Sequence, residues 1–174
     1  MPAALLAANI QALVRSIAGV GADPLALTRQ MSSYLSRYTP IDRFATAVFI
    51  VLNRDTGELT YVNAGHNAPI VFGSRSARLL EATGMPLGLF PEAAFTANTA
   101  ILLPGGALLL FTDGLTDSIS GENAEDRLRE ALADDSGKTM HILKSLVDPN
   151  FNEEDVTILL VKRNADVASI GSLG

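Results

Sequence analysis

Residues 108–115, with the sequence Leu108-Leu109-Leu110-Phe111-Thr112-Asp113-Gly114-Leu115, decide the fold of this chain. The apolar residues predict a buried strand, and this strand ends abruptly on the Asp113 carboxylate and on Gly114. Because Mg²⁺ and Mn²⁺ prefer oxygen ligands on a rigid scaffold, Asp113 is a candidate metal ligand, and Gly114 lets the backbone come close. A plainer interpretation also exists, since an Asp-Gly pair after a strand is a turn signal in its own right.

A second acidic cluster precedes the last predicted strand. Residues 152–155 read Asn152-Glu153-Glu154-Asp155 and run directly into the apolar segment 156–161. Neighbouring strands of a sheet lie about 4.8 Å apart, so carboxylates at their ends can share one or two cations. We therefore expect Asp113 to lie close to the pair Glu154 and Asp155 at one edge of the sheet.

The composition indicates a single soluble domain and excludes several kinds of site. The chain has 174 residues, 48% of them hydrophobic, and 13 basic against 19 acidic residues produce a formal net charge of −6. This charge argues against nucleic acid or an anionic membrane as the main partner. The absence of cysteine excludes disulfides, thiolate zinc sites and a cysteine nucleophile, and it fits a reducing cytoplasm. Neither apolar stretch, 3–14 or 99–111, has the features of a membrane span or an export signal.

The spacing of apolar residues predicts an α+β fold. Helices are expected at 3–18, 24–37, 124–133 and 138–147, and strands at 44–52, 58–62, 69–72, 78–80, 94–102, 107–112 and 156–162. Because the strands follow one another through turns and do not alternate with helices, we predict antiparallel sheet packed by helices. We expect one domain over residues 1–163 and a loose tail over 164–174, which has no periodicity.

Five short motifs follow one another along the chain. They are Arg43-Phe44-Ala45-Thr46-Ala47, Tyr61-Val62-Asn63-Ala64-Gly65-His66-Asn67, Met85-Pro86-Leu87-Gly88-Leu89, Thr112-Asp113-Gly114-Leu115-Thr116-Asp117 and Glu154-Asp155-Val156-Thr157. In the order and spacing of these motifs, residues 1–163 resemble the SpoIIE/RsbU branch of the PPM (protein phosphatase 2C-like) phosphatases. The resemblance implies an antiparallel β-sheet sandwich flanked by helices, the α/β/β/α arrangement of PPM phosphatases.

The resemblance also implies an activity, which is metal-dependent hydrolysis of phosphoserine or phosphothreonine in a protein. Two Mn²⁺ or Mg²⁺ ions, held mainly by aspartates, bridge a water molecule and orient it for attack on phosphorus. In bacteria the usual substrate of this family is a small phosphorylated anti-sigma-factor antagonist of the STAS type. The resemblance therefore implies a cytoplasmic protein of bacterial signal transduction and stress response.

Carried over residue by residue, the resemblance places Asp113 on the metal-binding catalytic aspartate of the Thr-Asp-Gly motif, with Gly114 beside it. The terminal family motif is usually Asp-Asp-x-Thr, with its first acid on the metal. This chain has Glu154 at that place, so ligation either stays with the longer Glu154 side chain or passes to Asp155. Asp117 has two interpretations, which are a hydrogen-bonded outer shell of the metal site and a solvated turn carboxylate.

His66 is a weaker candidate for catalysis. Imidazole titrates near neutral pH and can protonate a leaving alkoxide, which makes His66 a possible general acid. However, His66 lies in the turn sequence Asn-Ala-Gly-His-Asn at the end of a predicted strand. The favoured interpretation is therefore a ring that hydrogen-bonds backbone.

The sequence departs from the family at its start. Family members carry a Gly-Asp-x-x-Gly-x-Gly segment, whose Asp holds the metals, directly before a helix that opens like Met1-Pro2-Ala3-Ala4-Leu5, and residues 1–174 contain no such segment. A misassigned initiation codon, an engineered boundary and a genuinely short protein all fit this start. We expect an N-terminally truncated domain with impaired activity, whose uncovered sheet edges favour a homodimer. Two functions stay open, a protein serine/threonine phosphatase domain and a non-catalytic phosphatase-like interaction module.

Overall fold

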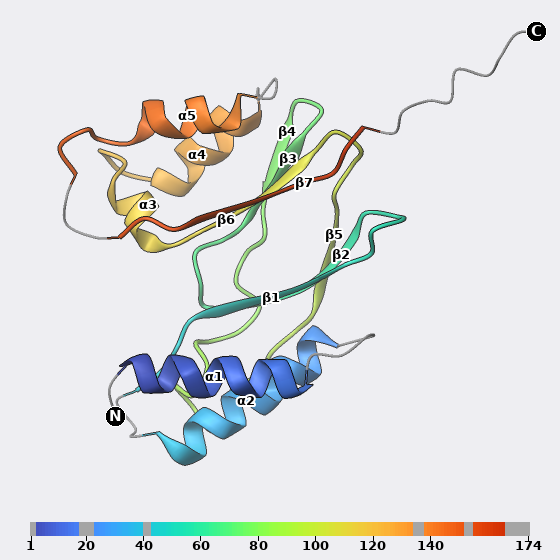
Figure 1. The fold of residues 1–174 in the computed structure, drawn as a ribbon, viewed down its shortest axis with the longest axis vertical. Helices are drawn as coiled ribbons and strands as arrows, with labels where there is room; N and C mark the ends of the chain where they lie inside the picture. The colour runs from blue at the N-terminus through green and yellow to red at the C-terminus, as the bar shows by residue number, and fades with distance from the viewer. Residues whose placement is uncertain (1–2, 18–22, 40–42, 134–137, 152–154, 166–174) are drawn as a thin grey trace, which may run out of the picture. The chain divides into compact units, whose positions relative to one another are not determined.

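The computed structural model describes residues 3–17, 23–39, 43–133, 138–151 and 155–165 (Figure 1). The chain forms two compact units, one from Met1–Ala68 and Leu80–Ala100 and the other from Pro69–Leu79 and Ile101–Gly174. Both units combine helices with β-strands, and the strand pairings described below are antiparallel. This confirms the α+β class predicted from the sequence.

The first unit begins with two helices, α1 (Ala3–Ile17) and α2 (Pro24–Tyr38), which lie side by side in Figure 1. Both agree with the predicted ranges to within one residue. Asp23 caps α2, because its Oδ1 accepts a hydrogen bond from the Leu25 backbone N–H at 2.9 Å and Pro24 supplies a helical φ at the first position. Thr39 is the C-cap of this helix, and its backbone N–H donates to the carbonyl of Leu35.

A three-stranded sheet belongs largely to the same unit. Its strands β1 (Ala47–Leu52), β2 (Glu58–Ala64) and β5 (Asn98–Ile101) lie in the order β1-β2-β5. In the β1–β2 hairpin, Ala47 pairs with Ala64 and Leu52 pairs with Leu59. Asn53 shapes the turn of this hairpin, because its Oδ1 accepts hydrogen bonds from the backbone N–H groups of Asp55 and Thr56 at 3.0 and 3.2 Å.

The core of the first unit joins α2 to this sheet. Leu27, Met31 and Leu35 recur at helical spacing on one face of α2, and they share a hydrophobic cluster with Val62 and Ala64 of β2. All five side chains are buried. The apolar face of α2 therefore covers a sheet, as its periodicity predicted.

The second unit contains a four-stranded antiparallel sheet. Its strands β3 (Ile70–Gly73), β4 (Ser76–Leu79), β6 (Ala107–Phe111) and β7 (Ile158–Lys162) lie in the order β4-β3-β6-β7. β6 thus lies between β3 and β7, and Phe111 at its end pairs with Ile158 at the start of β7. Ala107, Leu108 and Leu109 of β6 are buried together with Phe111, as the apolar run predicted.

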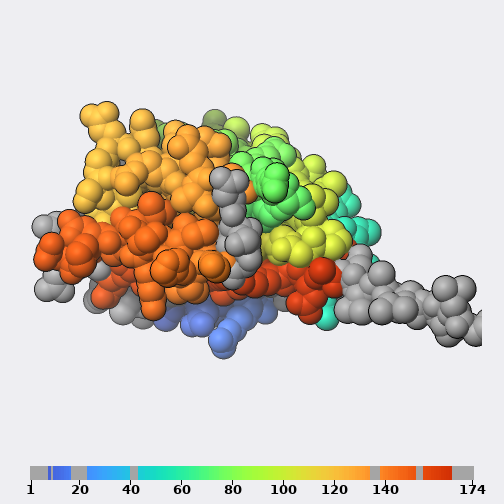
Figure 2. Space-filling model, turned by 90° about the horizontal axis from the view of Figure 1, so that it is seen from above, coloured from blue at the N-terminus to red at the C-terminus, as the bar shows by residue number. Residues whose placement is uncertain are grey.

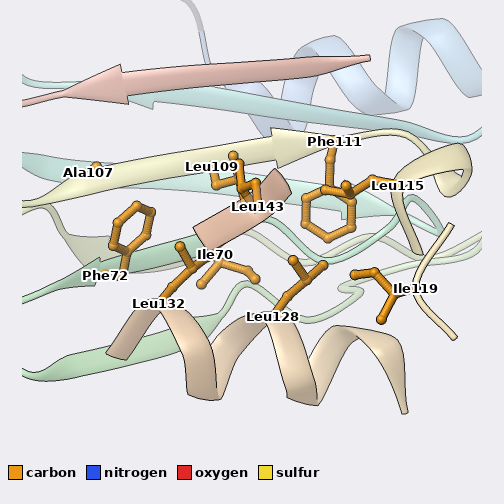
Figure 3. Packing of buried hydrophobic residues seen from close by; sticks show 10 residues of the cluster. All are labelled: Ile70, Phe72, Ala107, Leu109, Phe111, Leu115, Ile119, Leu128, Leu132 and Leu143. Carbon is orange, nitrogen blue, oxygen red and sulfur yellow. The ribbon is translucent and has the colours of Figure 1, made fainter. Parts of the chain in front are cut away.

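Three helices accompany this sheet, α3 (Asp113–Asp117), α4 (Ala124–Ala133) and α5 (Thr139–Leu146). α4 packs on β3 and β4, and α5 packs against α4. Figure 2 shows the outer surface that α4 and α5 present side by side. In the core, Leu128 and Leu132 of α4 extend toward the sheet, where Ile70 lies, and Phe111 lies next to Leu115 (Figure 3).

Several boundaries differ from the sequence prediction. β1 begins three residues later than expected, because Ala45 exchanges backbone hydrogen bonds with Leu87 outside the β1–β2 ladder. β5 and β7 also begin later, at Asn98 and Ile158. The Asp-Gly turn after β6 is the start of the short helix α3, which the sequence analysis did not predict.

Two other expectations concern the ends of the chain and the membrane. From residue 166 onward, the predicted loose tail lies outside the described residues. Among the helices that the structure describes, none has both the length and the apolar character needed to cross a membrane.

A two-residue turn joins β3 to β4. Ser74 and Arg75 both have a positive φ, of 52° and 64°, between the paired residues Gly73 and Ser76. This is the backbone of a type I′ turn, which favours Asn-Gly because other residues are strained in the left-handed region.

Replacing Arg75 with Gly is therefore expected to raise the free energy of unfolding by about 0.5–1 kcal/mol. Urea denaturation of the purified variant measures this change. The matched control is Arg78→Gly in β4, which is expected to lower the free energy of unfolding because Gly weakens a strand. A loss of stability in Arg75→Gly would show that the turn does not strain this residue.

Candidate metal centre

Asp113 lies at the junction between the buried strand β6 and the short helix α3. Phe111 is the last residue of β6, Thr112 is the N-cap of α3 and Asp113 is the first residue of that helix. Phe111 and Leu115 anchor this junction in the core on either side (Figure 3). Asp113 itself is exposed, and its Oδ1 accepts a hydrogen bond from the Gly114 N–H at 3.0 Å. The buried strand therefore holds the exposed Asp113 carboxylate in a defined position.

Two hydrogen bonds between Thr112 and Thr157 connect this junction to the segment before β7. The backbone N–H of Thr112 donates to the carbonyl of Thr157 at 3.1 Å, and the N–H of Thr157 donates to Thr112 Oγ1 at 3.0 Å. An N-cap threonine usually accepts from its own helix, but the Thr112 hydroxyl makes no such bond. We call this pair the threonine clasp. Sequence reasoning assigned it no role, although each threonine lies in one of the five motifs.

Gly114 lets the Asp155 backbone come close to the start of α3. A Cβ placed on the buried Gly114 would lie 2.5 Å from the carbonyl oxygen of Asp155 and 3.1 Å from its carbonyl carbon. Only glycine fits such a close backbone approach. The Asp155 backbone therefore lies directly against the residue next to Asp113. The Asp155 backbone thus lies near Asp113 in the structure, while the expected convergence of the carboxylates of Asp113, Glu154 and Asp155 and their role as metal ligands stay predictions.

The threonine clasp can be tested by removing its hydroxyl. Thr112→Val keeps the side-chain shape but leaves the Thr157 N–H without its partner, so we expect the free energy of unfolding to fall by about 1 kcal/mol. Thr112→Ser retains the hydroxyl and is expected to remain closer to the wild type. Urea denaturation of the two variants decides this, and equal stability of the valine and serine variants would contradict the clasp.

The structure describes only some of the other predicted site residues. Glu154 lies outside the described residues, so the choice between Glu154 and Asp155 stays open. Asp155 is exposed, and Asp117 is exposed at the last position of α3. Within the described parts of the chain, no three His, Cys, Asp or Glu side chains are grouped so that they could hold a metal ion.

The donors that are present suit a hard divalent cation. Asp113 and Asp155 supply carboxylate oxygens, which Mg²⁺ and Mn²⁺ prefer. In the described ranges, no Lys or Arg forms an ion pair with either residue. No basic side chain of the described residues therefore neutralises either carboxylate, which leaves both available to a cation. Their chemistry suits one side of a metal site, and the assignment of either residue as a ligand stays a prediction.

His66 lies in the first unit, just after β2. The buried Asn63 holds its backbone, because Asn63 Oδ1 accepts from the His66 N–H at 2.8 Å and Nδ2 donates to the carbonyls of His66 and Leu80 at 3.0 and 3.1 Å. His66 Nδ1 lies 3.1 Å from Thr46 Oγ1. The ring thus bonds a hydroxyl and not the backbone that the sequence suggested. Sequence reasoning missed Asn63, whose only signal was its place in the second motif.

Comparison with known proteins identifies a family and several relatives that are similar to this chain in sequence. A family model described as Stage II sporulation protein E (SpoIIE) matches residues 1–164. Protein IcfG from Synechocystis sp. is 34% identical over 132 residues, which cover 70% of this chain and 21% of that protein. Phosphoserine phosphatase RsbP from Bacillus subtilis is 25% identical over 168 residues, which cover 91% of this chain and 41% of that protein. The chain therefore spans less than half of either relative.

Solved structures share the fold. The RsbU and RsbW domains of Rv1364c from Mycobacterium tuberculosis match with a TM-score of 0.77 and 26% identity, over 94% of this chain and 49% of that chain. The PP2C phosphatase domain of SpoIIE from Bacillus subtilis, with a fragment of its regulatory domain, matches with a TM-score of 0.76 and 16% identity, over 90% and 50%. RsbX in complex with magnesium matches with a TM-score of 0.65 and 19% identity, over 88% and 70%. These similarities confirm the PPM phosphatase-like fold that the five motifs implied.

Proposed function

This chain belongs to the SpoIIE family. We propose that it functions as the domain of a metal-dependent protein serine/threonine phosphatase that acts on a regulatory phosphoprotein. The observation that carries the proposal is the contact between Gly114 and the Asp155 backbone, which brings Asp155 next to the residue after Asp113 at the end of a buried strand. Cation-activated water needs no cysteine or histidine nucleophile, and the chain has no cysteine.

For the metal site, we assign Asp113 as the main ligand of Mn²⁺ or Mg²⁺ and Glu154 or Asp155 as the second carboxylate. When bound, such cations activate a water molecule and orient it for in-line attack on phosphorus. The chain's own contribution is positional, because the threonine clasp holds the start of α3 and Gly114 keeps the Asp155 backbone close. The magnesium in the RsbX structure supports this choice of cation.

For the substrate, we propose a phosphorylated STAS-type anti-sigma-factor antagonist in the cytoplasm. Two relatives support a regulatory role of this kind. RsbP carries the name phosphoserine phosphatase, and the RsbU domain of the Mycobacterium tuberculosis protein was solved together with an RsbW domain. The homodimer expected from the sequence is a separate proposal, which sedimentation of the purified chain tests.

The decisive test is metal-dependent release of phosphate from a phosphoserine-bearing STAS protein. Residues 1–174 contain no Gly-Asp-x-x-Gly-x-Gly segment, so this polypeptide alone is expected to hydrolyse the substrate slowly. We therefore also consider a polypeptide in which such a segment, taken from a family relative, is placed before Met1, and we call it the extended polypeptide. The extended polypeptide is expected to release phosphate with Mn²⁺ and to stop when EDTA removes the metal. Inertness of the extended polypeptide toward phosphoserine and phosphothreonine would contradict the proposal.

A non-catalytic phosphatase-like interaction module is the second candidate. It is favoured by one observation, since no three potential metal ligands are grouped in the part of the chain that the structure describes. In this case the extended polypeptide would bind the phosphorylated STAS protein without releasing phosphate. Turnover that depends on Mn²⁺ would exclude this second function.

A further inference from the structure

An open groove between α1 and α2 is lined by arginine, serine and tyrosine side chains. Its volume is about 430 Å³, within the range of typical ligand pockets. The lining includes Leu13 of α1 and, from α2, Arg29, Ser33, Tyr34, Arg37 and Tyr38. All of these residues belong to the first unit, whereas Asp113 and Asp155 belong to the second. The groove is therefore built from residues other than those of the candidate metal centre.

The groove is positively charged in an otherwise acidic chain. The formal net charge of the whole chain is −6, yet α1 and α2 contain three arginines and no acidic residue. In the described ranges, Arg29 and Arg37 form no ion pair with a carboxylate. Both side chains are exposed. Their guanidinium groups are therefore available to an anion, and Arg binds phosphate and carboxylate groups in a bidentate manner.

The spacing along α2 places hydrogen-bond donors and aromatic rings on one face. Arg29, Ser33 and Arg37 recur every four residues, which aligns them along the helix. Tyr34 and Tyr38 continue this face, with ring centroids 5.0 Å apart and ring planes tilted by 44°. Tyr38 is 64% exposed, so a planar ring can still pack on it.

We propose that this groove binds an organic anion in which a phosphate or carboxylate group is attached to a planar ring. The anionic group bonds to the guanidinium groups of Arg29 and Arg37 and to the Ser33 hydroxyl. The ring packs on Tyr38 and Tyr34. This binding is independent of the proposed phosphatase activity, because it involves neither a metal ion nor the acidic segments around Asp113.

Phenylphosphonate is a suitable probe, because a phosphatase cannot hydrolyse its carbon–phosphorus bond. Calorimetric titration of the whole chain in EDTA, which removes metal-dependent binding elsewhere, is expected to detect its binding. The double variant Arg29→Gln/Arg37→Gln is expected to bind at least about tenfold more weakly, since two charge-assisted contacts are lost. The matched control is Arg15→Gln, which removes one exposed arginine of α1 that does not line the groove. This control is expected to bind like the wild type.

Three outcomes would overturn the proposal. One is the absence of phenylphosphonate binding by the wild-type chain. Another is an equal loss in Arg15→Gln and in the double variant, because diffuse attraction by the helices would then explain binding. The third is equal affinity for inorganic phosphate, which would remove the role of the ring. If circular dichroism shows that the double variant is unfolded, the single variant Arg37→Gln takes its place in the same titration.

Discussion

Asp113→Asn is expected to reduce Mn²⁺-dependent phosphate release by the extended polypeptide by about 10³-fold or more, because loss of a metal ligand removes several kcal/mol of transition-state stabilisation. Asparagine has nearly the same shape as aspartate but carries no charge. The buried side chains of Phe111 and Leu115, which anchor the junction of β6 and α3, are untouched by the substitution. The fold is therefore expected to remain, while Mn²⁺ affinity and turnover fall together.

The matched control is Glu122→Gln, which removes one exposed carboxylate from the same unit outside the candidate metal centre. Phosphate release and Mn²⁺ binding are measured for both variants at several Mn²⁺ concentrations. The control is expected to keep wild-type activity. Substantial turnover by Asp113→Asn at every Mn²⁺ concentration would show that Asp113 is not a principal ligand.

Helices and strands of this fold could be predicted where the pattern of apolar residues within a short segment defines them. The run 108–111 indicates a buried strand on its own, because four successive apolar residues fill a strand that is covered on both sides. The apolar spacing of Leu27, Met31 and Leu35 likewise predicts the buried face of α2. Asp113 could be singled out for the same reason, since only Thr112 separates it from the buried run.

Contacts between distant segments could not be predicted in this way. Thr112 and Thr157 are 45 residues apart, and nothing in either segment shows that the Thr112 hydroxyl would serve the other strand and not its own helix. The partner of the His66 ring is Thr46, which lies 20 residues earlier and is reached only because β1 and β2 pair. Periodicity describes which side of an element is buried, and it does not state which other segment covers that side.

Gly114→Ala is expected to damage the candidate metal centre by a different route from Asp113→Asn, because it leaves every carboxylate in place. The added methyl group would lie 2.5 Å from the carbonyl oxygen of Asp155. This atom belongs to the backbone and cannot rotate away, so the Asp155 segment must shift away from Asp113. We expect Mn²⁺ affinity to fall about 10- to 100-fold and the free energy of unfolding to fall by about 1–3 kcal/mol.

Gly105→Ala separates these two effects, since Gly105 has a positive φ of 78° but its nearest neighbour to an added Cβ lies 3.9 Å away. Alanine there is strained, so stability is expected to fall by about 1 kcal/mol, while Mn²⁺ affinity is expected to remain that of the wild type. Mn²⁺ binding to the extended polypeptide and urea denaturation measure the two quantities. If Gly114→Ala bound Mn²⁺ as tightly as Gly105→Ala, the close approach of Asp155 would have no part in holding the metal. A selective loss in Gly114→Ala would instead show that this contact aligns the two acidic segments for a cation.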